Sequence, residues 1–336
     1  MENIIENLYK RKVSINKFIG NENNASVYEG LLNVKNKNLS VIIKAIPRND
    51  LKYFTKLLLE IGFLKYLSKF VSSKKYICLC YSIKLTATHL IIVQEMPQGI
   101  TLTRFVEQIL NQEPKEYYRL ILITIYKLLL ALNYIHTKGV AHRGMNPDNI
   151  YVSYDSQTKS ITELKITDFS VSCGKYTELD IENSNNETTN WKHNNMFCES
   201  IDMMINPPEK FNINELVRKI QNLTTKNTQS RETSYLYLAK KADIWSLGII
   251  FWKLLNYNGS QNPLALKFPE NYQTDKSWMT FNGYKSVDKL IHNIFKIVVN
   301  LMLSEIPNRG KSNEILENFI IINKYYDDYD DNLKRT

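Results

Sequence analysis

The chain has 336 residues, 43% of them hydrophobic and 11% aromatic, and its formal net charge is +9. This amount of apolar material excludes a wholly disordered protein, and 11 glycines with 9 prolines exclude a collagen-like or proline-rich one. Because the basic residues are scattered in small groups without interleaved aromatic residues, a nucleic-acid-binding protein is only a remote alternative to a lysine-rich surface.

Cysteine spacing and the absence of sorting signals favour an intracellular, cytoplasmic protein. The four cysteines are Cys78, Cys80, Cys173 and Cys198. They form no CxxC pair, and no histidines cluster beside them, so neither a disulfide framework nor a structural zinc site is expected. Cys78 and Cys80 are expected in the core. The acidic start lacks the apolar core of a signal peptide, and the most apolar run, 244–257, is too short and polar to span a bilayer.

The first third of the chain is predicted to be rich in strands. Alternating and β-branched runs predict strands over residues 13–19, 26–31, 39–46, 76–85 and 89–94. Between the third and fourth of these, residues 50–69 carry leucines and isoleucines at helical spacing.

The pattern changes at Pro97-Gln98-Gly99, beyond which the chain is mostly helical. Helices are predicted over 102–110 and 116–137, and Gly139 is a suitable residue to end the second. A strand-rich part, a short joint and a helical remainder indicate an α+β protein of two lobes with a cleft between them. We place the N-lobe at 1–96, the hinge at 97–102 and the C-lobe at 103–322.

Three polar segments are expected outside the packed core. Residues 177–195 and 212–232 are predicted to be long loops or partly ordered insertions. The second insertion is either a partner-binding element or a tolerated surface loop. Residues 323–336 contain an acidic tract and are predicted to form a solvated tail.

A lysine and a glutamate in apolar surroundings form the first candidate pair. Lys44 follows three β-branched residues at the end of a predicted strand, and Glu60 lies among apolar residues of the predicted helix. Because an unpaired charge is costly to bury, an ion pair between them would resolve both placements. Two exposed surface charges are the alternative.

Two further polar groups lie where a strand begins or ends. Asn149 closes a polar loop just before a predicted short strand, and Asp168 ends an apolar strand. If the two strands are adjacent, these side chains supply oxygen ligands of the kind that Mg²⁺ prefers. In the alternative, Asp168 only caps a turn.

Together and in this order, these residues resemble the eukaryotic protein kinase family over about 13–320. The motifs that carry the resemblance are the glycine-rich loop at 19–28, Lys44, Glu60, Gln94 with Glu95-Met96-Pro97, the catalytic loop at 142–149, Asp168-Phe169-Ser170, Pro207-Pro208-Glu209, 243–248 and 301–309. The resemblance implies a bilobal fold with a small β-rich N-lobe that includes helix αC and a larger helical C-lobe. It also implies ATP and Mg²⁺ as cofactors and a protein as partner or substrate.

The resemblance assigns roles residue by residue. It implies nucleotide contacts from Ile19, Gly20, Val27, Lys44, Glu60, Glu95 and Met96, metal ligands at Asn149 and Asp168, and structural roles for His142, Arg143, Glu209, Asp243 and Arg309. It does not imply a histidine base, because this histidine is structural in the family.

The sequence departs from the family pattern at the residues that carry the chemistry. Gly144 stands where the catalytic aspartate is expected, and Asn146 stands where a lysine contacts the transferred phosphate. Glu22 and Ala25 replace two glycines of the phosphate-covering loop, and Ser170 replaces the last glycine of the metal-binding motif. No catalytic residue is therefore intact.

The departures favour a pseudokinase that binds ATP, with or without Mg²⁺, and acts through partners. The retained set of Lys44, Glu60, Asn149 and Asp168 keeps open the alternative of an active atypical serine/threonine protein kinase. The same four residues also allow a purely structural interpretation, with an internal ion pair and a capped turn.

Overall fold

The computed structural model describes residues 2–9, 12–22, 25–48, 61–174, 178–183, 188–192, 231–269, 271–272, 274–284, 289–305 and 308–334. The chain divides into two compact units. The first comprises residues 1–98 and 165–197, and the second comprises residues 99–164 and 198–336.

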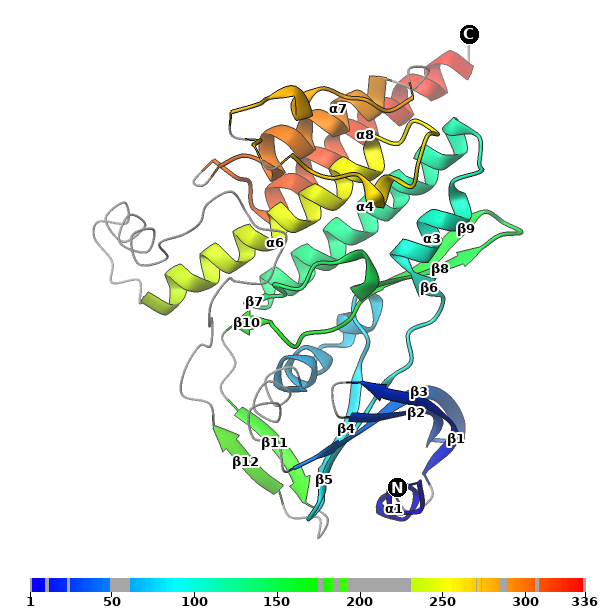
Figure 1. The fold of residues 1–336 in the computed structure, drawn as a ribbon, viewed down its shortest axis with the longest axis vertical. Coiled ribbons are helices and arrows are strands. Elements are labelled where there is room, and N and C mark those ends of the chain that lie inside the picture. Colours follow the sequence, from blue (N-terminus) through cyan, green and yellow to red (C-terminus); the bar gives the residue numbers. More distant parts are fainter. Residues whose placement is uncertain are drawn as a thin grey trace. The chain divides into compact units, whose positions relative to one another are not determined.

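An antiparallel sheet dominates the first unit (Figure 1). Its strands, in the spatial order β1-β2-β3-β5-β4, are β1 (Val13–Glu22), β2 (Ala25–Val34), β3 (Lys37–Pro47), β5 (His89–Glu95) and β4 (Cys80–Leu85). All five strands were expected from the alternation of apolar residues. Together with the helices of the second unit, they confirm the α+β class.

Apolar residues on both sides of this sheet hold the first unit together. On one side, Ile5 and Tyr9, in and just after α1 (Glu2–Leu8), join a buried cluster with Val41 and Val93. Residues 61–68 are helical, and the short helix η1 (Val71–Lys75) follows them. Cys78 and Cys80 are buried, as expected for core residues, whereas Cys198 lies outside the described residues.

The segment 177–195, predicted to be a long loop or a partly ordered insertion, contains two strands in its described part. β11 (Glu178–Asn183) pairs with β12 (Thr188–Lys192) in an antiparallel hairpin, and β11 also pairs in parallel with β4. Leu179 and Ile181 alternate with acidic residues, and Trp191 lies in the opposing strand. This short period-2 signal is masked in the sequence by the surrounding Asn, Glu and Thr residues.

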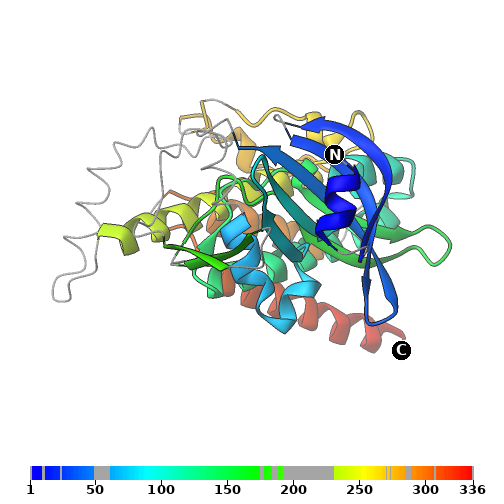
Figure 2. The same ribbon diagram turned by 90° about the horizontal axis from the view of Figure 1, so that it is seen from below.

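Helices dominate the second unit. They are α3 (Leu102–Ile109), α4 (Pro114–Thr137), α6 (Arg231–Leu255), α7 (Lys289–Ile297), the π-helix η5 (Val298–Met302) and α8 (Ser312–Lys334). The short 3₁₀ helices are η2 (Pro147–Asn149), η3 (Pro263–Ala265) and η4 (Ser277–Met279). The long helices α4, α6 and α8 lie side by side, as Figures 1 and 2 show.

Short strands accompany these helices. β6 (Ile100–Thr101), β8 (Ile150–Asp155) and β9 (Ser160–Ile166) form a three-stranded sheet in that order. The second unit also contains β7 (Val140–Ala141), whereas the short strand β10 (Cys173–Gly174) belongs to the first unit. β7 and η2 flank the polar loop that the sequence singles out.

Two helices extend into segments that the sequence predicted to be an insertion and a solvated tail. α6 begins at Arg231, well before Asp243 and at the end of the predicted insertion 212–232, of which residues up to 230 lie outside the described part. α8 continues through most of the predicted acidic tail, where no proline or glycine interrupts it.

Among the described helices, α4 has the length and apolar composition of a segment that could cross a membrane. However, 61% of its most apolar stretch is buried inside the protein, which is the pattern of a core helix. Its Tyr117 hydroxyl donates a hydrogen bond to the Leu254 carbonyl of α6 over 3.0 Å. This contact ties the two helices together inside the core.

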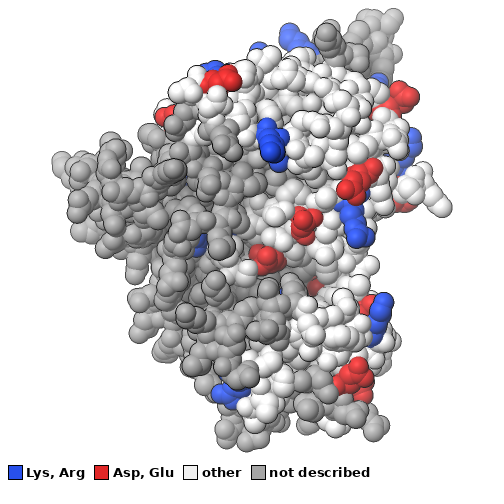
Figure 3. Space-filling model, viewed as in Figure 1, with Lys and Arg blue, Asp and Glu red and all other residues white. Residues whose placement is uncertain are grey.

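Charge is mixed over the surface drawn in Figure 3. On that face the described Lys and Arg side chains alternate with Asp and Glu side chains and form no single basic patch. That distribution gives the nucleic-acid alternative no support from this face.

The close packing of α6 at Gly248 predicts the effect of a small substitution. A methyl group on Gly248 of α6 would lie 2.9 Å from the Met302 Cβ and 2.9 Å from a Leu303 methyl carbon. Elsewhere in a helix, Gly→Ala stabilises by about 1 kcal/mol, whereas overpacking costs about 1–3 kcal/mol. We expect Gly248→Ala to lower the free energy of unfolding measured with urea. An unchanged or higher free energy of unfolding would show that α6 and the segment of Met302 and Leu303 move apart easily to make room for the methyl group.

Candidate functional site

Three of the predicted nucleotide residues of the first unit lie in one row across its sheet. Gly20 of β1 pairs with Val27 of β2, which pairs with Lys44 of β3. Residues paired directly across neighbouring strands point to the same face, so the Val27 and Lys44 side chains share a face. Ile19 occupies a bulge in β1 and is 51% exposed.

The β1–β2 connection forms a regular hairpin. Glu22 pairs with Ala25 at its tip, and the two residues between them, like the Glu22 side chain, lie outside the described part. Only one of the three glycines expected in a phosphate-covering loop is present, at Gly20. Its φ of +154° lies at the edge of the region that glycine adopts more easily than other residues.

The predicted ion pair of Lys44 with Glu60 is not tested, because Glu60 lies outside the described residues. Lys44 itself is half-buried in β3, next to Ile92 of β5 in the register. This position agrees with a lysine that leaves a buried strand near its end.

A different ion pair in this unit was missed by the sequence analysis. The Lys165 ammonium donates to the Glu95 carboxylate, which also accepts a hydrogen bond from the Leu79 N–H over 3.0 Å. The Lys165 side chain is only 4% exposed, so its charge needs this partner. Glu95, predicted to contact nucleotide, therefore uses its side chain to hold the sheet to the strand before Asp168.

The backbone N–H groups at the end of β5 and just after it also form hydrogen bonds within the protein. The Glu95 N–H donates to the Leu79 carbonyl over 2.8 Å, and the Met96 N–H donates to the Ser40 carbonyl over 3.1 Å. The next residue, Pro97, has no N–H. At these three positions the backbone thus has no N–H left for a ligand.

Asp168 lies in a strained turn and is held by Ser170. Its φ is +62°, which is uncommon for a residue other than glycine. The Ser170 hydroxyl donates to the Asp168 Oδ1 over 2.6 Å, and the Ser170 N–H donates to the same oxygen over 3.2 Å. The carboxylate therefore caps this turn, as the structural interpretation expected, and its Oδ1 already accepts two hydrogen bonds.

In the second unit, one buried carboxylate organises the polar loop. Asp243 of α6 accepts hydrogen bonds from the His142 N–H over 2.8 Å and from the Arg143 N–H over 2.6 Å. Its Oδ2 also lies 2.9 Å from the His136 Nε2 at the end of α4. Asp243 and His142 are fully buried, which agrees with the structural roles predicted for them.

The loop is closed by two hydrogen bonds at Gly144. The Gly144 N–H donates to the His142 Nδ1 over 3.0 Å, and the Asn149 side-chain amide donates to the Gly144 carbonyl over 2.9 Å. Because the amide nitrogen of Asn149 faces Gly144, its Oδ1 is the atom suited to ligate a metal. Gly144 is not among the described residues with positive φ, so its backbone can carry a side chain.

Two polar side chains that follow Gly144 in the loop, those of Asn146 and Asp148, have structural partners. Asn146 accepts a hydrogen bond from the Asp148 N–H over 3.1 Å and so caps η2. The Asp148 carboxylate accepts a hydrogen bond from the Thr103 hydroxyl of α3 over 2.6 Å. A cavity of about 390 Å³ lies beside Asn146, with Pro147 and Ile250 in its wall.

Arg309 is a second structural centre of the unit. It is 1% exposed, donates from Nη1 to the Lys241 carbonyl and from Nε to the Ser304 carbonyl, each over 3.0 Å, and lies over the Trp245 ring. Its predicted partner Glu209 lies outside the described residues. Among the described residues, no group of three or more His, Cys, Asp or Glu side chains is arranged to hold a metal.

Comparison with known proteins identifies the family that this geometry resembles. The family model of the protein kinase domain matches residues 13–200. Probable serine/threonine-protein kinase fhkA of Dictyostelium discoideum is 31% identical over 165 residues, which is 46% of this chain and 25% of that protein. Serine/threonine-protein kinase KSP1 of Saccharomyces cerevisiae is 22% identical over 222 residues, which is 63% of this chain and 18% of that protein.

A shorter match extends to another group of kinases. The Aurora kinase of Debaryomyces hansenii is 29% identical over 131 residues, which is 39% of this chain and 22% of that protein. The matched regions span a quarter or less of the length of these three curated relatives.

The buried His136–Asp243 pair predicts how stability depends on pH. Burial lowers the pKa of His136 below its ordinary 6.5, and the hydrogen bond to Asp243 offsets this only in part. As pH falls, the unfolded chain therefore takes up the proton first. The stabilisation that comes from keeping His136 neutral is complete above pH 6.5. It is lost as the pH falls through the lower pKa that His136 has in the folded protein.

We expect the urea midpoint of the wild type to fall between pH 7.5 and 5.5 by more than that of His136→Gln. Glutamine keeps a donor for Asp243 but does not titrate. An equal fall in the two proteins would contradict a neutral, buried His136.

Proposed function

Because the chain belongs to the protein kinase family and has serine/threonine-protein kinases among its relatives, we propose that it is a pseudokinase. In this proposal the chain binds ATP weakly and transfers phosphate at a severely reduced rate or not at all. Its output is the binding of a protein partner. The alternative of an active atypical serine/threonine kinase is an outcome of the tests below.

The observation that carries the proposal is the catalytic loop around Gly144. The hydrogen bonds that Asp243 and the His142 ring accept, and the one that Asn149 donates, hold the loop backbone in place. Gly144, however, offers no carboxylate to accept the proton of a substrate hydroxyl. Asp148 is an unsuitable replacement, because its Oδ1 is turned to Thr103. The loop therefore keeps its structure without its base.

The missing groups are large on the scale of enzyme catalysis. A positioned general base contributes about 10²–10⁴-fold to a rate, which is roughly 3–5 kcal/mol of barrier. Asn146 also lacks the charge of a phosphate-binding lysine, and its oxygen caps η2. Because phosphoryl transfer depends on positioning and electrostatics, losing both groups lowers the rate without requiring any loss of fold.

The residues that would hold a nucleotide and its metal are present. Lys44 would contact phosphate, and Asn149 Oδ1 and the Asp168 carboxylate each supply an oxygen donor of the kind that Mg²⁺ prefers. When bound, the ion would neutralise phosphate charge. Each of these oxygen donors, taken by itself, is of the chemical type that Mg²⁺ prefers, and this supports the proposal that nucleotide binding is retained.

Three features support weak rather than tight binding. Glu22 replaces a glycine of the phosphate-covering hairpin, and a negative charge at this sequence position opposes the binding of a polyanion. The N–H groups of Glu95 and Met96 are used within the sheet and Pro97 has none, so a base bound at this edge finds no N–H donor there. Ser170 occupies the Asp168 Oδ1 that a metal would share.

A binding role also agrees with the surroundings of the loop. The cavity beside Asn146 has a mixed wall in which Ile250 is apolar and the Lys253 ammonium bonds the Leu264 carbonyl over 3.0 Å. We propose that it takes a side chain of the partner. Phosphate transfer is not needed for such an interaction.

Ser170 provides a test of the nucleotide and metal site. A net hydrogen bond is worth about 0.5–1.5 kcal/mol, so removing this hydroxyl should strengthen Mg²⁺-dependent ATP binding roughly 2- to 12-fold. We expect both Ser170→Gly and the matched Ser170→Ala to show this gain in calorimetric titrations with and without Mg²⁺. Lys44→Met should abolish binding. Equal Mg²⁺ dependence in all of these proteins would contradict the assigned metal site.

The missing base is tested by restoring it. We expect Gly144→Asp combined with Asn146→Lys to transfer phosphate to a generic basic protein about 10²-fold or more faster than Gly144→Asn combined with Asn146→Lys, since the two differ only in the carboxylate. The measurement is the initial rate with radiolabelled ATP. Equal rates from the two folded variants would contradict the claim that the absent carboxylate limits transfer.

A further inference from the structure

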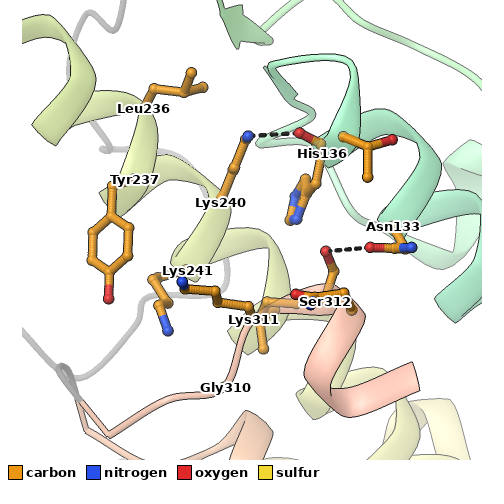
Figure 4. Close-up of a pocket in the computed structure, with 12 residues that line it drawn as sticks. Asn133, His136, Leu236, Tyr237, Lys240, Lys241, Gly310, Lys311 and Ser312 are labelled. Carbon is orange, nitrogen blue, oxygen red and sulfur yellow. Dashed lines mark hydrogen bonds between the residues drawn. The ribbon is translucent and has the colours of Figure 1, made fainter. Parts of the chain in front are cut away.

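A cavity of about 320 Å³ lies in the second unit, away from the catalytic loop (Figure 4). The end of α4, the first half of α6 and the start of α8 form its wall. Its size falls within the range of small-molecule sites, which is roughly 300–1,000 Å³. None of the residues 142–149 lines it, so it is distinct from the site proposed above.

Lysines from two different elements border this cavity. Lys240 and Lys241 come from α6, and Lys311 precedes α8. The Lys240 ammonium donates to the His136 carbonyl over 2.6 Å, a bond that is drawn in Figure 4, and the Lys241 ammonium donates to the Arg309 carbonyl. Both ammonium groups are thus fixed by neutral carbonyl oxygens.

The electrostatics around Lys241 favour an added anion. Burial, then the charge of Arg309, lowers the pKa of Lys241 to about 8, and Lys311 acts in the same direction. Glu314 opposes them, and its carboxylate also accepts a hydrogen bond from the Lys311 N–H over 3.3 Å. The described residues give the Lys311 ammonium no hydrogen-bond or ion-pair partner.

The backbone adds to this positive potential. α8 begins at Ser312 and runs for 23 residues, and Gly310, Ser312 and Asn313 all line the cavity. The N-terminus of a helix carries a partial positive charge and unpaired N–H groups, which suit an anion. The Ser312 hydroxyl donates a hydrogen bond to the Asn133 side-chain oxygen over 3.1 Å.

Two aliphatic residues contribute an apolar part of the wall. Leu236 and Ile244 of α6 are 9% and 1% exposed. Tyr237, the residue after Leu236 in α6, also lines the cavity (Figure 4). An inorganic ion alone would leave this part of the wall uncovered. A ligand that fills the cavity therefore carries an apolar group as well as a negative charge.

We infer that this cavity binds a phosphate monoester carried on a small apolar group, with Lys241, Lys311 and the N-terminus of α8 facing the phosphate and Leu236 and Ile244 facing the apolar group. Three ammonium groups stand against one carboxylate of Glu314, which matches the charge of roughly −2 on a phosphate monoester better than that of a carboxylate. The ester belongs either to a free metabolite or to a phosphorylated side chain of a protein.

The test is a calorimetric titration of the full chain with phenyl phosphate. We expect saturable binding, with inorganic phosphate at least 5-fold weaker and phenol not bound. Lys311→Ala should weaken phenyl phosphate binding at least 5-fold, because Lys311 is exposed and can be changed without disturbing the core. Lys296→Ala, an exposed lysine of α7 outside the cavity, is the matched control and should bind like wild type.

Further arms separate this cavity from other sites and distinguish the source of the ester. Lys44→Met should leave phenyl phosphate binding unchanged, since that lysine lies in the first unit. A phosphotyrosine peptide that binds with the same Lys311 dependence would indicate a protein source, and one that does not bind would indicate a free ester. Absence of saturable phenyl phosphate binding, or equal binding by wild type and Lys311→Ala, would overturn the inference.

Discussion

The second unit depends on one buried carboxylate, that of Asp243. It binds the side chain of His136 and the N–H groups of His142 and Arg143, so α4, α6 and the polar loop meet at this point. Because each of these donors is buried or half-buried, removing the acceptor would leave several of them unsatisfied, at a cost of about 1–3 kcal/mol each. This constraint acts through backbone groups and is indifferent to the side chain at position 144.

Because these contacts do not involve a side chain at position 144, they explain how, in the proposed function, the loop keeps its structure without a catalytic residue. The backbone of Gly144 is held at its N–H by His142 and at its carbonyl by Asn149, so neither contact needs a carboxylate. In the first unit Asp168 likewise has a structural role, because it caps a turn through Ser170. These structural contacts would hold the residues of the proposed site in place whether or not the chain transfers phosphate.

Local patterns were enough to predict the five sheet strands, the long helix α4 and the ordered motifs, because alternation and helical spacing are written into neighbouring residues. Contacts between distant segments were not predictable. Lys165 pairs with Glu95 and Asp148 with Thr103, and neither pair has a sequence signal beyond a charge beside an apolar or polar run. The β11–β12 hairpin was missed because its alternation is short, and the basic cavity needs three helices that the chain order alone does not bring together.

The most direct test of the account is ATP-dependent phosphate transfer by the unaltered chain. Wild type and Asp168→Ala would be incubated side by side with radiolabelled ATP, Mg²⁺ and a generic basic protein, and label on that protein and on the chain itself would be measured. The account predicts that wild type labels neither above the level of Asp168→Ala, although it is folded and binds ATP. Transfer at ordinary kinase rates that disappears in Asp168→Ala would contradict it and identify an active kinase that works without the missing base.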